Sequence, residues 1–192
     1  MTGVTPEDAR IAALAAGHFH EHGITATGVD ALSRAAGISK RTLYQRFGSK
    51  DGLIAAAYES LDLPVFQMFT QAVEAQTDDP RAQLEAFFAQ LEPLIRSPGF
   101  RGCPFTNASA ELADPLHPAH AVVRRHKERI RRWLLSRARA AGASNPEQLS
   151  RQLMLVFAGV QSQALLERSA RPARDACDLV RALIDAAITP GR

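Results

Sequence analysis

Apolar residues recur every three or four positions along nearly the whole chain, and strand-like alternation never lasts beyond four residues. Such spacing places apolar side chains along one face of an α-helix. Prolines, glycines and capping residues divide the pattern into segments. The sequence therefore predicts an all-α protein of about nine helices. These helices span approximately residues 6–22, 29–36, 40–47, 50–75, 80–96, 104–114, 118–141, 146–168 and 174–188.

Several of the expected helix ends carry local signals. Thr5-Pro6-Glu7-Asp8 offers an N-cap, a proline at the first helical position and acids in the first turn. Gly23 can end the first helix. Pro64 and Pro93 lie inside two expected helices. Because a proline removes one backbone hydrogen bond there, we expect a kink or break near each.

Residues 28–50 contain two short amphipathic helical patterns separated by a glycine. Gly37 can take the positive φ that a sharp turn requires. In the second pattern Leu43 and Phe47 are four residues apart, so both face the side that packs against the preceding helices. This arrangement is the sequence form of a helix-turn-helix that binds DNA.

The other side chains of the helix at residues 40–47 lie on its open sides. An α-helix fits the major groove, where Arg or Lys can bond guanine and Gln can bond adenine. Hydroxyl groups can reach phosphates. Lys50 begins the next helix, whose free N–H groups also suit a phosphate oxygen. We predict DNA contacts from Lys50, from the capping residue Ser39 and from six helical residues. The six are Lys40, Arg41, Thr42, Tyr44, Gln45 and Arg46.

Charge is unevenly distributed, although the formal net charge is only +3. Five basic residues between Thr27 and Lys50 stand against a single acid, Asp30. This local excess favours contact with DNA. Taken singly, Arg34 and Arg46 could equally be surface ion-pair partners.

A second basic run occupies residues 124–139, far from the first in sequence. The commoner explanation of such a run is a solvated helix face paired with acids, here Glu92 or Glu111. The alternative is that the run forms a specific site that binds an anionic effector.

Cysteine and histidine usage favours neither disulfides nor metal. Cys103 and Cys177 lack CxxC spacing, and reduced thiols fit a cytoplasmic protein. Only two of His18, His20 and His22 share a helical face, and no clustered cysteine accompanies them, so we expect packing rather than metal binding.

Other classes of protein find little support in the sequence. No secretory signal is visible, and no segment approaches the ~20 apolar residues of a membrane span. The absence of phosphate-binding glycine loops, nucleophile elbows and paired carboxylates indicates neither an enzyme nor a cofactor.

A family resemblance rests on several motifs in about the first 55 residues. They are Ala35-Ala36-Gly37-Ile38-Ser39, Thr42-Leu43-Tyr44, Phe47, Ser49-Lys50-Asp51 and Leu53. Together they resemble the signature of the tetracycline-repressor (TetR) family of bacterial regulators. The resemblance implies an all-α homodimer, with a DNA-binding domain at residues 1–50 and an effector-binding and dimerisation domain at residues 51–192.

Two details of the resemblance concern individual residues. Many members of the family carry Thr or Ser where Gly28-Val29 stand, and use it to contact a phosphate; here Thr27, one position earlier, is the candidate. Gly102-Cys103-Pro104, followed by Asn107 and Glu111, resembles a segment found in one subset of the family. Some relatives with this Gly-Cys pair respond to oxidants or electrophiles, which makes Cys103 a possible redox site. The alternative is a small buried residue.

Nine apolar residues of the larger domain could line an effector pocket, although at helical spacing they could equally be plain core. They are Phe66, Phe69, Phe87, Phe88, Leu91, Phe105, Trp133, Met154 and Phe157. The helices at residues 146–168 and 174–188 are the expected dimer surface, because small residues such as Gly159 and Ala182 permit close approach. A two-fold axis there would place two DNA-reading helices about 34–36 Å apart.

These features predict a ligand-responsive transcriptional regulator, a repressor that a small molecule releases from a pseudopalindromic operator. Effector binding would shift the helix that begins at Lys50, with Pro64 as a hinge. Three alternatives remain: an effector-independent DNA-binding protein, a redox-sensing regulator that uses Cys103, and an activator.

Overall fold

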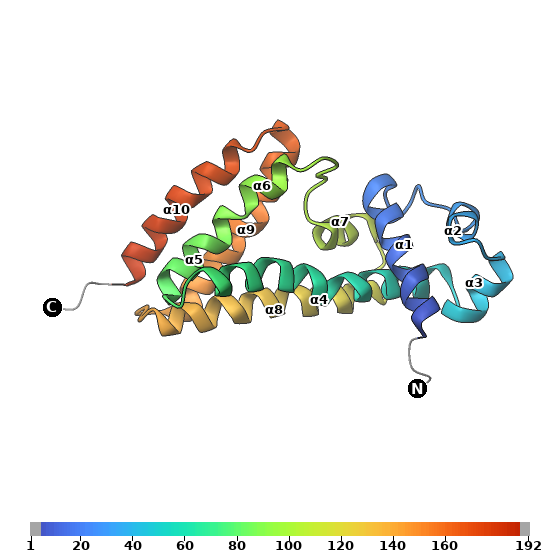
Figure 1. The fold of residues 1–192 in the computed structure, drawn as a ribbon, viewed down its shortest axis with the longest axis horizontal. Helices are drawn as coiled ribbons and strands as arrows, with labels where there is room; N and C mark the ends of the chain where they lie inside the picture. The colour runs from blue at the N-terminus through green and yellow to red at the C-terminus, as the bar shows by residue number, and fades with distance from the viewer. Residues whose placement is uncertain (1–4, 189–192) are drawn as a thin grey trace. The chain divides into compact units, whose positions relative to one another are not determined.

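A computed structural model describes residues 5–188, and every regular element in that range is a helix. The all-α prediction is therefore confirmed. Figure 1 shows the ten helices of the described range. They are α1 (Pro6–His22), α2 (Val29–Ala36), α3 (Lys40–Phe47), α4 (Lys50–Gln76), α5 (Pro80–Ala89), α6 (Leu91–Arg96), α7 (Pro104–Glu111), α8 (Ala119–Ala140), α9 (Pro146–Glu167) and α10 (Arg171–Ala187).

The two interior prolines behave differently. The segment expected as one helix at residues 80–96 is divided at Gln90 into α5 and α6. Pro93 accounts for the division, because it cannot donate a hydrogen bond to the carbonyl of Ala89 and its ring crowds that carbonyl. Pro64 does not end α4, which continues from Lys50 to Gln76.

Local sequence sets most of the other helix ends. The Thr5 hydroxyl accepts a hydrogen bond from the Asp8 N–H (3.1 Å), and the Asp8 carboxylate accepts one from the Thr5 N–H (3.2 Å), which completes a capping box. Gly23 ends α1 with φ 88°, a conformation that glycine adopts readily. At the start of α9 the Asn145 side chain accepts the Gln148 N–H at 3.0 Å. No helix within residues 5–188 is both long and apolar enough to cross a membrane.

The described residues form two compact units. The first takes in the residues up to Val65 together with Pro104–His126, and the second takes in Phe66–Cys103 and the residues from Lys127 onward. The functional division expected at residue 50 stays a prediction. This boundary differs from that of the first unit, which also contains residues 51–65 and the segment 104–126.

In the first unit, α1 packs against α2, and α2 packs against α3. Their apolar faces form one core, because the inward residues follow the helical period. Leu43 of α3 is completely buried in that core, as its spacing predicts, and Phe47 is half-buried. The fully or nearly fully buried residues also include Ile11, Ala15, Phe19, Leu32, Leu53, Ile54 and Ala57.

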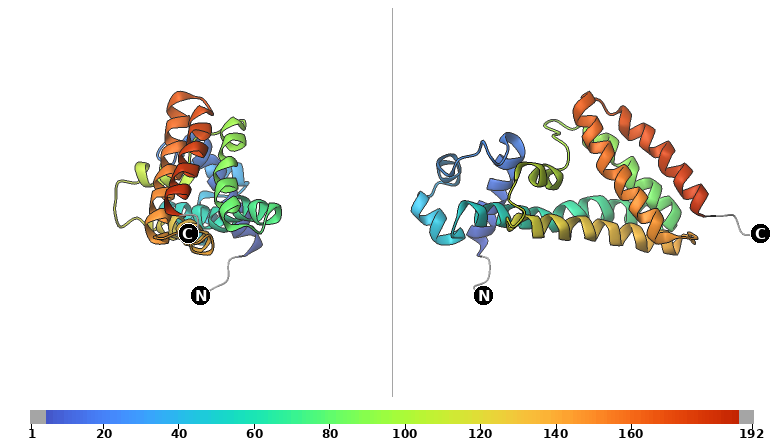
Figure 2. Two further views of the ribbon diagram at one scale, coloured as in Figure 1. Left: turned by 90° about the vertical axis from the view of Figure 1, so that its left-hand side faces the viewer. Right: turned by 180° about the vertical axis from the view of Figure 1, so that it is seen from behind.

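In the second unit, α9 and α10 lie side by side as an antiparallel pair, and α10 also packs on α5 (Figures 1 and 2). An aromatic cluster fills the core of this unit. Phe87 is completely buried at its centre, with ring centroids 5.3 Å from those of Phe69, Trp133 and Phe157. Aromatic pairs at such distances add to the stabilisation that burial of the rings provides.

The basic residues of α8 are largely paired, but not with the acids that the sequence suggested. Glu128 binds Arg131 (2.7 Å) and Arg132 (2.9 Å). Glu147 binds Arg139 at 2.5 Å. The prediction of a paired face was right, whereas the choice of Glu92 and Glu111 as partners was wrong, since helical period does not identify tertiary neighbours. Those two acids bind Arg96 and the backbone of residues 24–25, respectively.

Acid should remove the contribution of Glu128 to stability. Hydrogen bonds from Arg131, and then from Arg132, lower the pKa of Glu128 to about 2 from a usual value of 4.5. A carboxylate whose pKa is lowered by folding stabilises the protein above about pH 4.5, and this contribution is lost as the pH falls toward about 2. Glu128→Gln should cost about 1 kcal/mol near pH 7, since the side chain is 37% exposed and solvent screens the pairs.

Urea unfolding at a series of pH values measures this difference. Glu167→Gln is the control, because Glu167 is exposed and forms no ion pair within residues 5–188. A Glu128→Gln difference that stayed constant down to pH 2 would contradict the assignment.

Candidate nucleic-acid interface

The turn between α2 and α3 is fixed by the backbone. Gly37 adopts a left-handed conformation (φ 70°, ψ 27°), and its N–H donates to the Arg34 carbonyl at 3.1 Å. The Ile38 N–H donates to the Ser33 carbonyl at 3.0 Å. These two hydrogen bonds form a Schellman motif, which ends α2 sharply and sets the direction of α3.

α3 presents the side chains that the sequence assigned to its open sides. The Ser39 hydroxyl caps the helix by accepting the Thr42 N–H at 3.0 Å, and the two hydroxyl groups lie 2.9 Å apart. The Tyr44 side chain is 44% exposed. Lys40, Arg41, Gln45 and Arg46 are exposed and Thr42 is half-buried. One helix thus offers guanidinium, ammonium, amide and hydroxyl groups to solvent.

Two of the α3 cations are already paired. Lys40 binds Asp30 at 2.5 Å, and Arg46 binds Asp8 at 2.7 Å. A hydrogen bond from the Thr5 hydroxyl, followed by that from Arg46, lowers the pKa of Asp8. Arg41 has no partner within residues 5–188. Because the paired cations are exposed, exchanging a carboxylate for a phosphate costs little.

The start of α4 lies tightly against the end of α3. A side chain at Gly52 would collide with the Phe47 carbonyl, so only glycine allows this approach. The Lys50 ammonium donates to the Ile24 carbonyl at 3.1 Å. The sequence predicted a phosphate contact for Lys50, and in this structure its charge is held at the edge of the α1–α2 turn.

Thr27 lies in the core rather than on the surface. Its side chain is 3% exposed, and its hydroxyl donates to the Gly23 carbonyl at 2.6 Å. The N-cap of α2 is Gly28, which offers no side-chain hydrogen bond. We therefore leave Thr27 out of the candidate DNA contacts, because its only polar side-chain atom is used internally.

Sequence reasoning missed the groups that hold this interface from outside α3. Asp8 binds Arg46, and the Ile24 carbonyl accepts a hydrogen bond from Lys50. Glu111 accepts a hydrogen bond from the Ile24 N–H. Their distance in sequence from α3 gives no periodic signal. The sequence offered two signals for them, the acid Asp8 in the first turn of α1 and the motif Gly102-Cys103-Pro104 with Asn107 and Glu111.

The residues suggested for an effector pocket do not all gather in one place. Phe105 lies in the first unit, where its ring stacks on His126 with centroids 3.6 Å apart. The other eight belong to the second unit. Phe69, Phe87, Phe88, Leu91, Trp133 and Phe157 are buried there, whereas Phe66 and Met154 are half-buried.

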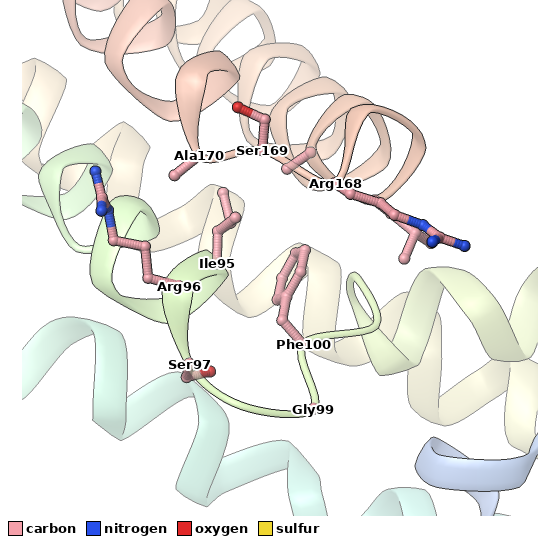
Figure 3. Close-up of a pocket in the computed structure, with 10 residues that line it drawn as sticks. Ile95, Arg96, Ser97, Gly99, Phe100, Arg168, Ser169 and Ala170 are labelled. Atoms are coloured by element: carbon pink, nitrogen blue, oxygen red, sulfur yellow. The ribbon is translucent and has the colours of Figure 1, made fainter.

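The second unit also has an open cavity of about 470 Å³, drawn in Figure 3. Its walls come from the end of α6, the loop that follows, and the turn between α9 and α10. The Arg96 and Arg168 side chains point to opposite sides in Figure 3, and the Phe100 ring lies between the loop and the turn. The volume suits a small ligand. None of the nine residues suggested for the effector pocket lines this cavity.

Cys103 is 7% exposed, and its sulfur accepts a hydrogen bond from the Lys127 ammonium at 3.2 Å. Its redox role stays a prediction. Within the described part of the chain, no group of three or more His, Cys, Asp and Glu residues is placed to hold a metal ion.

Comparison with known proteins identifies the family. Residues 11–57 match the model of bacterial regulatory proteins of the tetR family, and residues 80–180 match the tetracyclin repressor-like C-terminal domain. The chain is similar to sav143 from Streptomyces avermitilis, assigned as a TetR transcriptional regulator. The identity is 32%, the TM-score is 0.84, and the match covers 95% of this chain and 98% of sav143.

Two further relatives agree. SCO4454, a TetR-family transcriptional regulator from Streptomyces coelicolor, is 27% identical with a TM-score of 0.85, covering 95% of this chain and 97% of SCO4454. The transcriptional regulator AcuR of Cereibacter sphaeroides is 28% identical over 158 residues, which are 78% of this chain and 72% of AcuR. TetR-family regulators bind DNA and are dimers. This chain belongs to the TetR family of bacterial transcriptional regulators.

Proposed function

We propose that the protein is a repressor that binds a pseudopalindromic DNA operator as a homodimer and leaves it when a small effector binds. The exposed polar face of α3, fixed by the Gly37 turn, carries the proposal. A helix of eight residues reaches only a few bases, so one copy has little selectivity. Two copies related by a two-fold axis would read two half-sites.

Residues of α3 divide by the part of DNA that they suit. Arg41 and Gln45 are exposed and able to form bidentate contacts with base edges. Ser39, Thr42 and Tyr44 offer hydroxyl groups that suit phosphates. Lys40 and Arg46 would exchange Asp30 and Asp8 for phosphate oxygens, which releases condensed counterions from the DNA.

Dimerisation is proposed through α9 and α10. Leu155 and Leu166 of α9 are 74% and 77% exposed, and Leu179 of α10 is 51% exposed. Exposed Gly159 and Ser162 lie on the same helical face as the two α9 leucines. An exposed apolar face on two packed helices suits an isologous four-helix interface.

Effector control is proposed through α4. This helix begins directly after the helix-turn-helix of α2 and α3 (residues 29–47), here called the reader, and ends in the second unit. The aromatic cluster of that unit is the proposed effector site. An effector that binds one arrangement of α4 better than another shifts the population toward it. Pro64 suits a hinge, because proline weakens the helix at that point. The half-site separation would then no longer match the DNA.

Two alternatives concern the signal that the protein senses and the direction of its effect on transcription. Lys127 beside the Cys103 sulfur favours a redox-sensing variant of the mechanism, in which thiol oxidation replaces effector binding. Activation instead of repression would appear as loss of the target transcript, rather than its rise, on deletion of the gene. A cytoplasmic location is part of the proposal, since the DNA target lies there.

Lys50→Ala and Gln45→Ala test the proposal in different ways. Lys50→Ala should weaken binding to all duplex sequences and reduce the slope of log affinity against log salt by about 1. Gln45→Ala should change base preference, with a cost of about 1–3 kcal/mol at one base pair. Fluorescence anisotropy over a series of salt concentrations and single-base operator variants measures both effects.

The two variants serve as controls for each other, because one removes a charge and the other removes base recognition. Unchanged affinity and unchanged salt slope for Lys50→Ala would show that Lys50 contacts no phosphate. The ammonium would then serve only the Ile24 carbonyl.

A further inference from the structure

Glu111, the last residue of α7, binds the turn between α1 and α2. One of its carboxylate oxygens accepts the Ile24 N–H at 2.7 Å and the Thr25 N–H at 3.2 Å. These two residues directly follow Gly23, the C-cap of α1. Charged acceptors form stronger hydrogen bonds than neutral ones. A carboxylate shared by two successive N–H groups therefore holds this turn firmly.

The same turn is held from α4. The Lys50 ammonium donates to the Ile24 carbonyl at 3.1 Å, so both peptide groups of Ile24 are bound by charged side chains. The Ile24 side chain is 2% exposed. Gly23 leaves room for this close approach, because a Cβ atom there would lie 3.1 Å from the Glu111 carboxylate and would push it back by a few tenths of an ångström.

The segment 104–126, which carries Glu111, makes further contacts with α4 within the first unit. His117 lies 3.3 Å from the Asp51 carboxylate of α4, and Phe105 packs edge-on against Tyr58. The chain enters this segment from the second unit at Cys103–Pro104 and returns at His126–Lys127. A change of state in the second unit can therefore reach the reader along α7 as well as along α4.

We infer that Glu111 is a positioning residue for DNA binding, which fixes the α1–α2 turn and, through Ile24, the position of Lys50. The inference rests on the proposed function. Displacement of α7 would release the turn, and the reader would lose the pre-organisation that makes its contacts with DNA favourable. Effector control would then have a second route, independent of a hinge at Pro64.

The direction of the change in DNA affinity distinguishes a positioning role from simple charge repulsion. A surface acid near a DNA-binding face repels phosphates, so its removal should strengthen binding. A positioning role predicts the opposite for Glu111→Ala, with binding about tenfold weaker, as loss of a charged hydrogen bond implies. Glu111→Gln removes the charge but keeps an oxygen acceptor for the two N–H groups, so it should bind at least as tightly as the wild type.

The test uses the full chain and a duplex selected from a random library by the wild-type protein. Affinities of Glu111→Ala, Glu111→Gln and Glu111→Asp are compared with that of Glu167→Ala, an exposed acid in α9. Glu111→Asp keeps the charge and withdraws the carboxylate, so weaker binding is expected even if the alanine variant does not fold. Amide exchange at Ile24 and Thr25 should accelerate in the alanine variant, while α9 stays protected.

The outcomes separate the two claims. If the wild-type protein enriches no duplex, the proposed function is wrong and the inference falls with it. If the wild type binds and Glu111→Ala binds as tightly or more tightly, the inference alone is wrong. Weaker binding by the alanine variant, recovered by glutamine, supports it.

Discussion

Replacing Leu155 and Leu166 together by aspartate should convert the protein to a monomer and weaken operator binding about 100-fold or more. Both leucines are exposed on one face of α9, and apolar surface of this kind is stabilised when a partner covers it. Two carboxylates on each copy would face their symmetry mates across a two-fold interface. Linking two readers raises affinity by about 10²–10⁴, and a monomer loses that gain.

Sedimentation equilibrium and operator titration measure the two parts of this result. Met68→Asp is the matched control, since Met68 is 50% exposed on α4 and lies outside the proposed face. It should leave both dimer and affinity intact. If the double aspartate variant remained a dimer with wild-type affinity, the interface would have to lie elsewhere.

Phe87→Ala should lower the free energy of unfolding by about 3–5 kcal/mol, the range found for removal of a buried phenylalanine. The ring is completely buried and stacks on Trp133 with an interplanar angle of 29°. Its removal leaves a cavity bordered by aromatic rings that cannot collapse without losing their own contacts. Urea unfolding followed by Trp133 fluorescence measures the loss directly.

Phe100→Ala is the comparison for this core prediction. Phe100 is half-buried on the wall of an open cavity, so its removal deletes fewer contacts and should cost less than half as much. Equal costs for the two variants would mean that the aromatic cluster is not the centre of the core.

Most helix limits and the exposed polar face of α3 were predictable because their causes are local. Gly23, Gly37 and Gly48 end their helices with φ values of 88°, 70° and 75°, as glycine permits. The spacing of Leu43 and Phe47 left the polar side chains of α3 on its open sides, where the structure has them. These features depend on the chain within a few residues.

Tertiary partners were less predictable. Periodicity identifies the buried face of a helix but not the element that covers it. Thr27 faced inward rather than toward DNA, and Phe105 joined a different unit from the other aromatic residues. Glu111 was expected to pair with a basic helix and instead binds backbone N–H groups of the α1–α2 turn. The outcomes for Phe105 and Glu111 depend on contacts between segments that are far apart in sequence.

The central claim is that two copies of α3 read two related DNA half-sites. Selection of duplexes from a random library, followed by footprinting of the enriched sequence, tests it most directly. We expect a pseudopalindrome whose half-site centres are about one helical turn apart (~10 base pairs), or a multiple of it, with the two half-sites occupied by the two copies of a dimer. Enrichment of no sequence, or a footprint without two-fold symmetry, would contradict the account.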